Sequence, residues 1–98
     1  MRNGYELRRN VLVEGINSID KLSCKYPKGT FYAMVNIQKT GLKSEEFAYE
    51  LLQSVQVAVV PGITYGEASE GYVRIAYTMH EDKIKEGLQR IKQFVDSL

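Results

Sequence analysis

The fold of this chain is decided by residues 57–77, which read VAVVPGITYGEASEGYVRIAY. The four apolar residues 57–60 predict a short strand that is covered on both faces. The proline and glycine at 61–62 should end this strand, and a glycine-rich loop is expected as far as Gly71. Residues 72–77 alternate in polarity and predict a second strand. One face of that strand should carry Val73, Ile75 and Tyr77, and the other Tyr72, Arg74 and Ala76.

The sequence before this stretch predicts two helices and a further strand. Residues 5–19 have the apolar spacing of a helix, and residues 30–37 alternate as a strand does after a turn at Pro27. A second helix should begin with Ser44 as its N-cap, followed by acidic residues that suit the positive end of a helix. The positions expected to face the core are Tyr5, Leu12, Ile16 and Ile19 in the first helix, Phe31, Ala33, Val35 and Ile37 in the strand, and Phe47, Ala48, Leu51, Leu52 and Val55 in the second helix.

The C-terminal residues predict one more helix, which should begin within a residue or two of His80. Its apolar stripe consists of Ile84, Gly87, Leu88, Ile91, Val95 and Leu98. Its favourable charge pairs, four residues apart, are Glu81 with Lys85 and Glu86 with Arg90. The predicted order is helix, strand, helix, strand, strand, helix. This order indicates an α+β domain in which helices pack against a small, mostly antiparallel sheet.

Length and composition restrict the domain organisation and the class of partner. The 98 residues suffice for a single domain, residues 1–98. Thirteen Lys and Arg against twelve Asp and Glu leave a formal charge of +1, which predicts neither a nucleic-acid partner nor an anionic membrane. Cys24 is the only cysteine, so no disulfide can form within the chain. The sequence has no signal-peptide pattern and no apolar run near the ~20 residues of a membrane span, and a cytoplasmic location is expected.

Arg74 is the first candidate for a functional residue. It occupies the middle of a predicted strand with apolar neighbours, and Ala76 on the same face leaves space around it. A guanidinium there offers a planar fork of donors that suits a carboxylate held by two parallel hydrogen bonds. Position alone also allows a wet sheet edge, from which Arg74 simply points into solvent.

Tyr65 is the second candidate. It lies in a loop between Gly62 and Gly66, where a sharply bent backbone would present one aromatic ring at a defined place. An ordinary turn between two strands is the alternative. His80, the only histidine, is expected to cap a helix or lie on the surface, and Cys24 with His80 is not a dyad unless the two meet. No cluster has metal-ligand spacing, so no metal ligand is predicted, and the residues themselves single out no catalytic or cofactor-binding group.

Four motifs together resemble the C-terminal, small domain of the pyridoxal-phosphate-dependent aminotransferases of class I and II, fold type I, in the aspartate aminotransferase superfamily. The motifs are PKGTFY at 27–32, SEEFA at 44–48, VAVVPGITYG at 57–66 and GYVRIAY at 71–77. The first predicted helix, with Arg8 and Arg9, resembles the end of the long helix that leads into that domain. The resemblance covers nearly the whole chain, in the family's order and spacing.

This resemblance implies roles for both candidate residues. Arg74 matches the arginine that binds the α-carboxylate of the amino-acid substrate, and Tyr65 matches an aromatic residue that lies near the substrate. Amino acids and 2-oxo acids would be the substrates of the parent enzyme, which is expected to be a homodimer. The small domain of such enzymes moves towards the large domain when substrate binds, which aligns the substrate and excludes water.

The resemblance also implies that most of the catalytic machinery lies outside this sequence. Pyridoxal phosphate needs a lysine that holds it covalently, an acidic partner for its ring nitrogen and groups that bind its phosphate. In the family these belong to the large cofactor-binding domain, which is absent here. None of the eight lysines has the expected Ser-x-Ser-Lys setting; they are Lys21, Lys25, Lys28, Lys39, Lys43, Lys83, Lys85 and Lys92. The chain alone is therefore expected to be inactive and to bind no cofactor.

The sequence also allows two other hypotheses about function, each from a different class of protein. A free-standing amino-acid-binding or regulatory module could use Arg74 to hold a carboxylate without any chemistry. The strand at 71–77 is also faintly similar to the aromatic strand of an RNA-recognition motif, although the neutral charge and the element order argue against RNA.

Overall fold

The computed structural model describes residues 2–27, 32–77 and 80–98, and the side chains from Glu6 onwards within these ranges. Three α-helices are α1 (Arg2–Asn17), α2 (Ser44–Val55) and α3 (Glu81–Asp96). The strands are β1 (Ser23–Cys24), β2 (Tyr32–Asn36), β3 (Val60–Pro61) and β4 (Tyr72–Ala76). Short 3-10 helices are η1 (Gln38–Thr40), η2 (Gly62–Tyr65) and η3 (Glu67–Ser69). The predicted α+β class is confirmed.

The strands form one antiparallel sheet in the order β1-β2-β4-β3. β4 is flanked by β2 and β3, and Arg74 is paired with Met34 on one side and with Val60 on the other. β1 was not predicted, because two residues carry no alternation for a sequence pattern to detect. The observed order therefore has one strand more than the sequence indicated.

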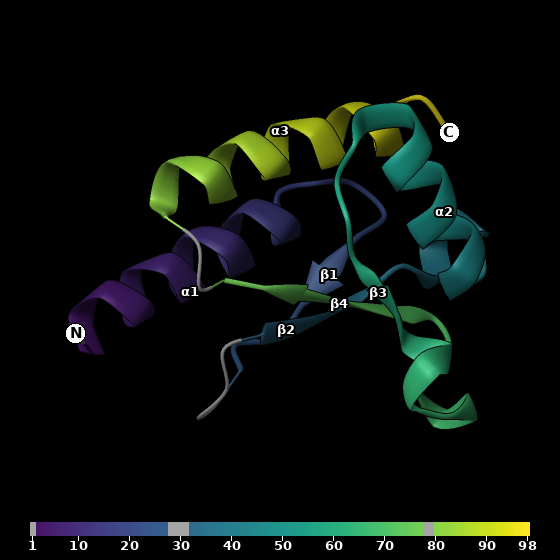
Figure 1. The fold of residues 1–98 in the computed structure, drawn as a ribbon, viewed down its shortest axis with the longest axis horizontal. Coiled ribbons are helices and arrows are strands. Elements are labelled where there is room, and N and C mark those ends of the chain that lie inside the picture. Colours follow the sequence, from purple (N-terminus) through teal and green to yellow (C-terminus); the bar gives the residue numbers. More distant parts are fainter. Residues whose placement is uncertain (1, 28–31, 78–79) are drawn as a thin grey trace.

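The core lies between one face of the sheet and the helices. α1 and α3 run side by side across that face, and α2 lies at the end of the sheet where β3 and η2 are found (Figure 1). Phe47 of α2 meets Phe94 of α3 edge to face, with ring centroids 5.4 Å apart. Gly15 lets α1 approach α3, because a Cβ there would overlap the Leu88 side chain. The largest fully buried hydrophobic side chains are Val13, Ile16, Val35, Ile37, Phe47, Leu51, Val73 and Val95.

Most predicted core positions are confirmed, with two exceptions in the helices. Leu52 and Leu98 are each 46% exposed, so they lie outside the core. Phe94, which the predicted stripe of α3 did not include, is buried. The side chain of Tyr5, and Thr30 and Phe31 of the predicted strand, lie outside the described residues.

Residues 57–60 were wrongly predicted to form a strand covered on both faces. The ladder begins only at Val60 and includes Pro61, and residues 57–59 are irregular, with Ala58 exposed. Val57 and Val59 instead pack against the core from an irregular segment that leads to the sheet edge. The segment after Pro61 is also more ordered than the predicted loop, because it forms η2 and η3.

The sequence predicted Ser44 as the N-cap of α2, but Ser44 is the first helical residue. Its hydroxyl is fully buried and donates to the carboxylate of Glu70, 2.9 Å away. Glu70 also accepts from the backbone N–H of Ser44 at 2.8 Å. A carboxylate from a distant part of the chain thus satisfies the helix start, where a serine side chain was expected to do so.

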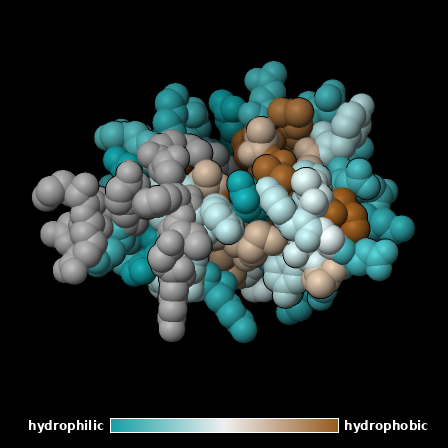
Figure 2. Space-filling model, turned by 60° about the horizontal axis from the view of Figure 1, so that its bottom comes forward, coloured by the Kyte–Doolittle hydropathy of each residue, from teal (hydrophilic) through white to brown (hydrophobic). Residues whose placement is uncertain are grey.

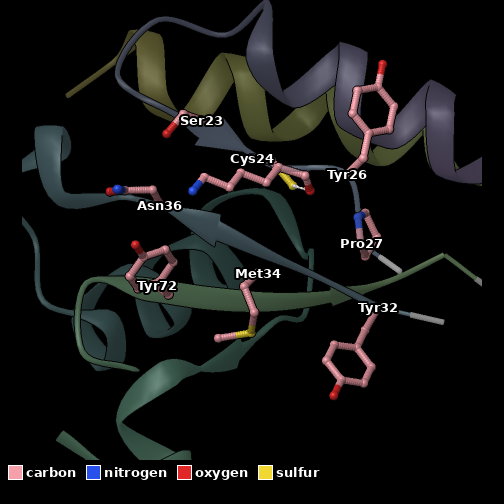
Figure 3. A pocket seen from close by; sticks show the side chains of 9 residues that line it. Ser23, Cys24, Tyr26, Pro27, Tyr32, Met34, Asn36 and Tyr72 are labelled. Carbon is pink, nitrogen blue, oxygen red and sulfur yellow. Dashed lines mark hydrogen bonds between the residues drawn. The ribbon is translucent and has the colours of Figure 1, made fainter. Parts of the chain in front are cut away.

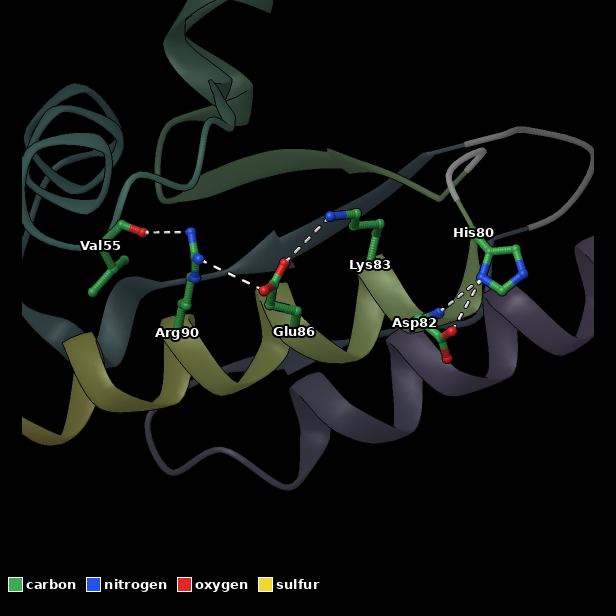
Figure 4. Close-up of polar contacts among 6 residues, drawn as sticks. All are labelled: Val55, His80, Asp82, Lys83, Glu86 and Arg90. Atoms are coloured by element: carbon green, nitrogen blue, oxygen red, sulfur yellow. Dashed lines mark hydrogen bonds and ion pairs between the residues drawn. The ribbon is translucent and has the colours of Figure 1, made fainter.

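The polar side of α3 agrees with the sequence prediction. His80 caps the helix, with Nδ1 accepting from the backbone N–H of Asp82 (Figure 4). Lys85 pairs with Glu81 at 3.0 Å, and Arg90 pairs with Glu86 at 3.7 Å. Arg90 also donates from Nη1 to the carbonyl of Val55, 3.4 Å away, which links α3 to the C-terminal end of α2.

Candidate functional site

Arg74 lies at the centre of β4 and points to the face of the sheet that α1 and α3 do not cover. Its neighbour Val73 is fully buried on the helix side, and alternation along the strand turns Arg74 to the opposite side. Tyr72 shares this face, as does Met34, the β2 residue paired with Arg74. The Arg74 side chain is half-buried, so it is not a freely solvated residue at a sheet edge.

Two tyrosine rings contact the guanidinium of Arg74. Its Cζ lies 4.3 Å from the centroid of the Tyr32 ring and 4.9 Å from that of Tyr65. The structure therefore brings together the two residues that the sequence singled out, Arg74 and Tyr65. It adds Tyr32, to which the sequence assigned no role. The β2–β4 register was needed to find this contact, and no local pattern contains that register.

The donors of Arg74 have no acceptor in the described part of the chain. No side chain or carbonyl in residues 2–27, 32–77 and 80–98 forms a hydrogen bond or an ion pair with its guanidinium. By contrast Arg90, on the opposite layer of the molecule, has both Glu86 and the carbonyl of Val55. A half-buried cation with free planar donors is chemically suited to an anion brought from outside, above all a carboxylate.

A hollow of about 430 Å³ adjoins this site. Tyr32 and Met34 of β2 and Tyr72 of β4 line it on one side, and β1 with the segment that follows it, as far as Pro27, lines it on the other (Figure 3). Tyr32 and Met34 point away from α1 and α3, so they belong to the same open face as Arg74. The remaining lining residues are Ser23, Cys24, Lys25, Tyr26 and Asn36.

The position of Tyr65 depends on a close backbone approach at Gly62. A Cβ at Gly62 would overlap the carbonyl oxygen of Ser69 and lie 2.6 Å from that of Tyr72. Only glycine lets η2 pack against the start of β4 in this way. The sequence predicted a sharp bend at the two glycines around Tyr65. Gly66, with a φ of 116°, has a backbone that favours glycine, whereas Gly62 is required by close packing.

Glu70 links this loop to α2. Its carboxylate accepts from the backbone N–H of Gly71 at 2.9 Å as well as from both donors of Ser44. The Ser44 hydroxyl also accepts from the backbone N–H of Ile63 in η2 at 3.3 Å. The backbone hydrogen bond from Ser44 is the main cause that lowers the pKa of Glu70, although partial burial opposes it. The charged form of Glu70 therefore stabilises the segment that carries Tyr65.

Cys24 and His80 serve separate structural roles. The Cys24 thiol donates to the carbonyl of Lys25 at 3.3 Å, and burial raises the pKa of this thiol. The His80 ring belongs to the start of α3. Within the described ranges, no group of three or more His, Cys, Asp or Glu side chains could hold a metal ion. None of the helices described combines the length and the apolar character needed to cross a membrane.

The described lysines do not fit covalent attachment of a carbonyl cofactor. Such a lysine must be held in an enclosed site that lowers its pKa or fixes its amine. Lys21 is half-buried, and the other described lysines are exposed: Lys25, Lys39, Lys43, Lys83, Lys85 and Lys92. Among the described lysines, none lies in an enclosed site.

The fold and this site define an α+β domain with an arginine on an open sheet face, flanked by two tyrosines and without an acceptor among the described residues. Residues 1–91 match the sequence profile of the family described as aminotransferase class I and II. The chain belongs to this family.

Individual relatives agree with this assignment. YugH of Bacillus subtilis is 45% identical over 97% of this chain, and an aspartate aminotransferase of Pyrococcus horikoshii is 38% identical over 98% of it. The crystal structure of an aromatic aminotransferase from Pyrococcus horikoshii has a TM-score of 0.94 at 38% identity, over 98% of this chain. The chain spans 24% to 25% of the length of these relatives.

Proposed function

We propose that this chain is the C-terminal, small domain of a pyridoxal-phosphate-dependent aminotransferase of fold type I. The family membership of residues 1–91 supports the reaction class, and the quarter-length coverage of relatives supports the domain assignment. The rest of the parent would supply a large domain that binds the cofactor. The parent is expected to be a homodimer. A cytoplasmic location is part of the proposal and rests on the sequence features described above.

Arg74 is the residue that carries this proposal. Its guanidinium is half-buried, faces away from α1 and α3, and has no acceptor among the described residues. The α-carboxylate of an amino acid or a 2-oxo acid would satisfy two of its donors at once. Because that carboxylate is common to every substrate of a transaminase, a fixed arginine can serve both halves of the reaction.

Tyr65 has the second role in the proposal. Its ring is 47% exposed and lies against Arg74, so it would border the bound substrate. The uncovered sheet face would turn towards the large domain, and closure of the two domains would exclude water from the carboxylate pair. Pyridoxal phosphate, when bound by the parent, supplies the electron sink for the amino-group transfer. This chain's share is to bind and orient the substrate.

The test is the Arg74→Lys variant of the protein encoded by the complete reading frame that contains this chain. Lysine keeps the charge and loses the planar pair of donors. We expect kcat/KM for the amino acid to fall by about 10²–10³, with a raised KM for the amino acid and for the oxo acid alike.

Arg90→Lys is the matched control, because Arg90 is also half-buried but contacts α2 and Glu86. It should leave kcat/KM nearly unchanged. Wild-type kinetics in the Arg74 variant would contradict the role of Arg74. Transamination by the 98-residue chain alone would contradict the domain assignment.

A further inference from the structure

The two rings that contact Arg74 reach it from opposite flanks of β4. Tyr32 begins β2, which pairs with β4 on one side, and Tyr65 ends η2, which follows β3 on the other. The distances of 4.3 and 4.9 Å from Cζ to the ring centroids lie within the ~6 Å range of cation–π contacts. The Tyr32 ring is the nearer of the two.

Rings placed over a guanidinium leave its donors available. All five N–H groups of arginine lie in the guanidinium plane, so a ring that stacks parallel to that plane covers a face of it and leaves the donor edge open. Arginine has many rotamers, and an anion that binds it must bear the cost of ordering them. Contacts with Tyr32 and Tyr65 restrict those rotamers before any ligand arrives.

We propose that Tyr32 is a positioning residue for Arg74: its ring, together with that of Tyr65, holds the guanidinium so that its donor edge meets a planar carboxylate. This inference rests on the proposed function, since it takes a carboxylate as the ligand of Arg74. It goes further by assigning a role to Tyr32, the first residue of β2. It also states that the aromatic face of this side chain, and not its hydroxyl, holds the guanidinium of Arg74.

The experiment uses the ¹⁵N-labelled chain and the arginine Nε–Hε signals in its NMR spectrum, with acetate as the carboxylate probe. The Arg74 signal is assigned as the one lost in Arg74→Lys. In the wild type this signal should be displaced by the ring currents of the two tyrosines, and it should shift saturably with acetate.

Three variants separate positioning from a general structural role. Tyr32→Leu should remove most of the ring-current displacement and weaken acetate binding by about two- to tenfold, the range expected for a cation–π contact. Tyr32→Phe keeps the ring and should retain the wild-type signal position and affinity. Tyr49→Leu removes a tyrosine that is 63% exposed on α2 and should change neither.

The outcomes also distinguish this inference from the proposed function. A wild-type Arg74 signal and acetate affinity in Tyr32→Leu would overturn the role of Tyr32. Loss of the signal position or of affinity in Tyr32→Phe would overturn the role of the ring face. A ring-current displacement that depends on Tyr32, without any response to acetate in the wild type, would support the positioning of Arg74 and contradict its role as the carboxylate site.

Discussion

Glu70 and Ser44 are 26 residues apart in the sequence, yet their contact determines how α2 begins. The Glu70 carboxylate accepts from two donors of Ser44 and one of Gly71, and the Ser44 hydroxyl in turn accepts from Ile63. These hydrogen bonds join the N-terminus of α2 to η2 and to the start of β4. Since η2 carries Tyr65, the contact between Glu70 and Ser44 at the start of α2 also fixes part of the candidate site.

The Glu70→Gln variant should lose stability in a pH-dependent way. The pKa of Glu70 in the folded chain lies below its ordinary value, chiefly because of the Ser44 backbone hydrogen bond. A carboxyl whose folded pKa is lowered contributes stability above its unfolded pKa, about 4.3, and loses that contribution as the pH falls through the folded pKa. The wild type should therefore be more stable than the variant at neutral pH, and the difference should shrink in acid.

Urea unfolding at about pH 7 and about pH 3.5 measures this difference. Glu50→Gln, which removes an exposed carboxylate of α2, is the control and should show a small difference that hardly changes with pH. An equal difference for Glu70→Gln at both pH values would contradict the assignment of the lowered pKa to these hydrogen bonds.

At the residue scale, local patterns in the sequence singled out Arg74 and Tyr65 as candidates, and the family resemblance implied their roles. The arginine interrupts an apolar strand, and the tyrosine lies between two glycines. Tyr32 and Glu70 have no such pattern. Their importance comes from partners that are distant in the sequence, so only the register of β2 with β4 and the path of η2 and η3 show it.

Among the elements, the helices could be predicted from the sequence more completely than the sheet. A stripe such as Leu12 and Ile16 is local, and it specifies both the helix and its buried face. β3 could not be predicted in the same way, because only Val60 and Pro61 come within hydrogen-bonding reach of β4. An apolar run shows that a segment is buried, but strand pairing depends on the neighbour that the fold provides.

Two glycines test this distinction between local and tertiary requirements. Gly62→Ala should destabilise the chain by about 1–3 kcal/mol, because its Cβ would overlap backbone carbonyls that cannot move without shifting η3 and β4. Gly87→Ala should stabilise it by about 1 kcal/mol, since no atom lies within 4 Å of the added Cβ in α3. Urea unfolding of both variants measures the two free energies.

The pair of glycine variants also reports on the site. Gly62→Ala should displace η2, and the ring-current displacement of the Arg74 NMR signal should decrease along with the stability. Gly87→Ala should leave that signal in place. A stable Gly62→Ala variant with an unchanged Arg74 signal would show that η2 can adjust, and that the close approach at Gly62 is not required.

For the whole molecule, the uneven coverage of the sheet has consequences for association. α1 and α3 cover one face, while the other exposes Tyr32 and Tyr65 together with the half-buried Met34 and Tyr72. Figure 2 brings the underside of Figure 1 forward and shows hydrophobic and intermediate residues near the middle of this side, with hydrophilic residues around its margin. Partly apolar faces of this kind mark surfaces that another protein or domain covers.

The 98-residue chain should therefore self-associate modestly through this face. Met34→Gln changes the polarity of the middle of the face at nearly constant side-chain size, and it should shift the equilibrium towards monomer. Leu52→Gln changes an apolar side chain of α2 that is 46% exposed, and it should leave the equilibrium unchanged. Sedimentation velocity over a range of concentrations measures the effect. A wild-type chain that sediments as a monomer at every concentration would contradict this prediction and show that Arg74 and its polar neighbours keep the face hydrated. The large domain of the proposed parent would then have to bind this face by more than apolar contact.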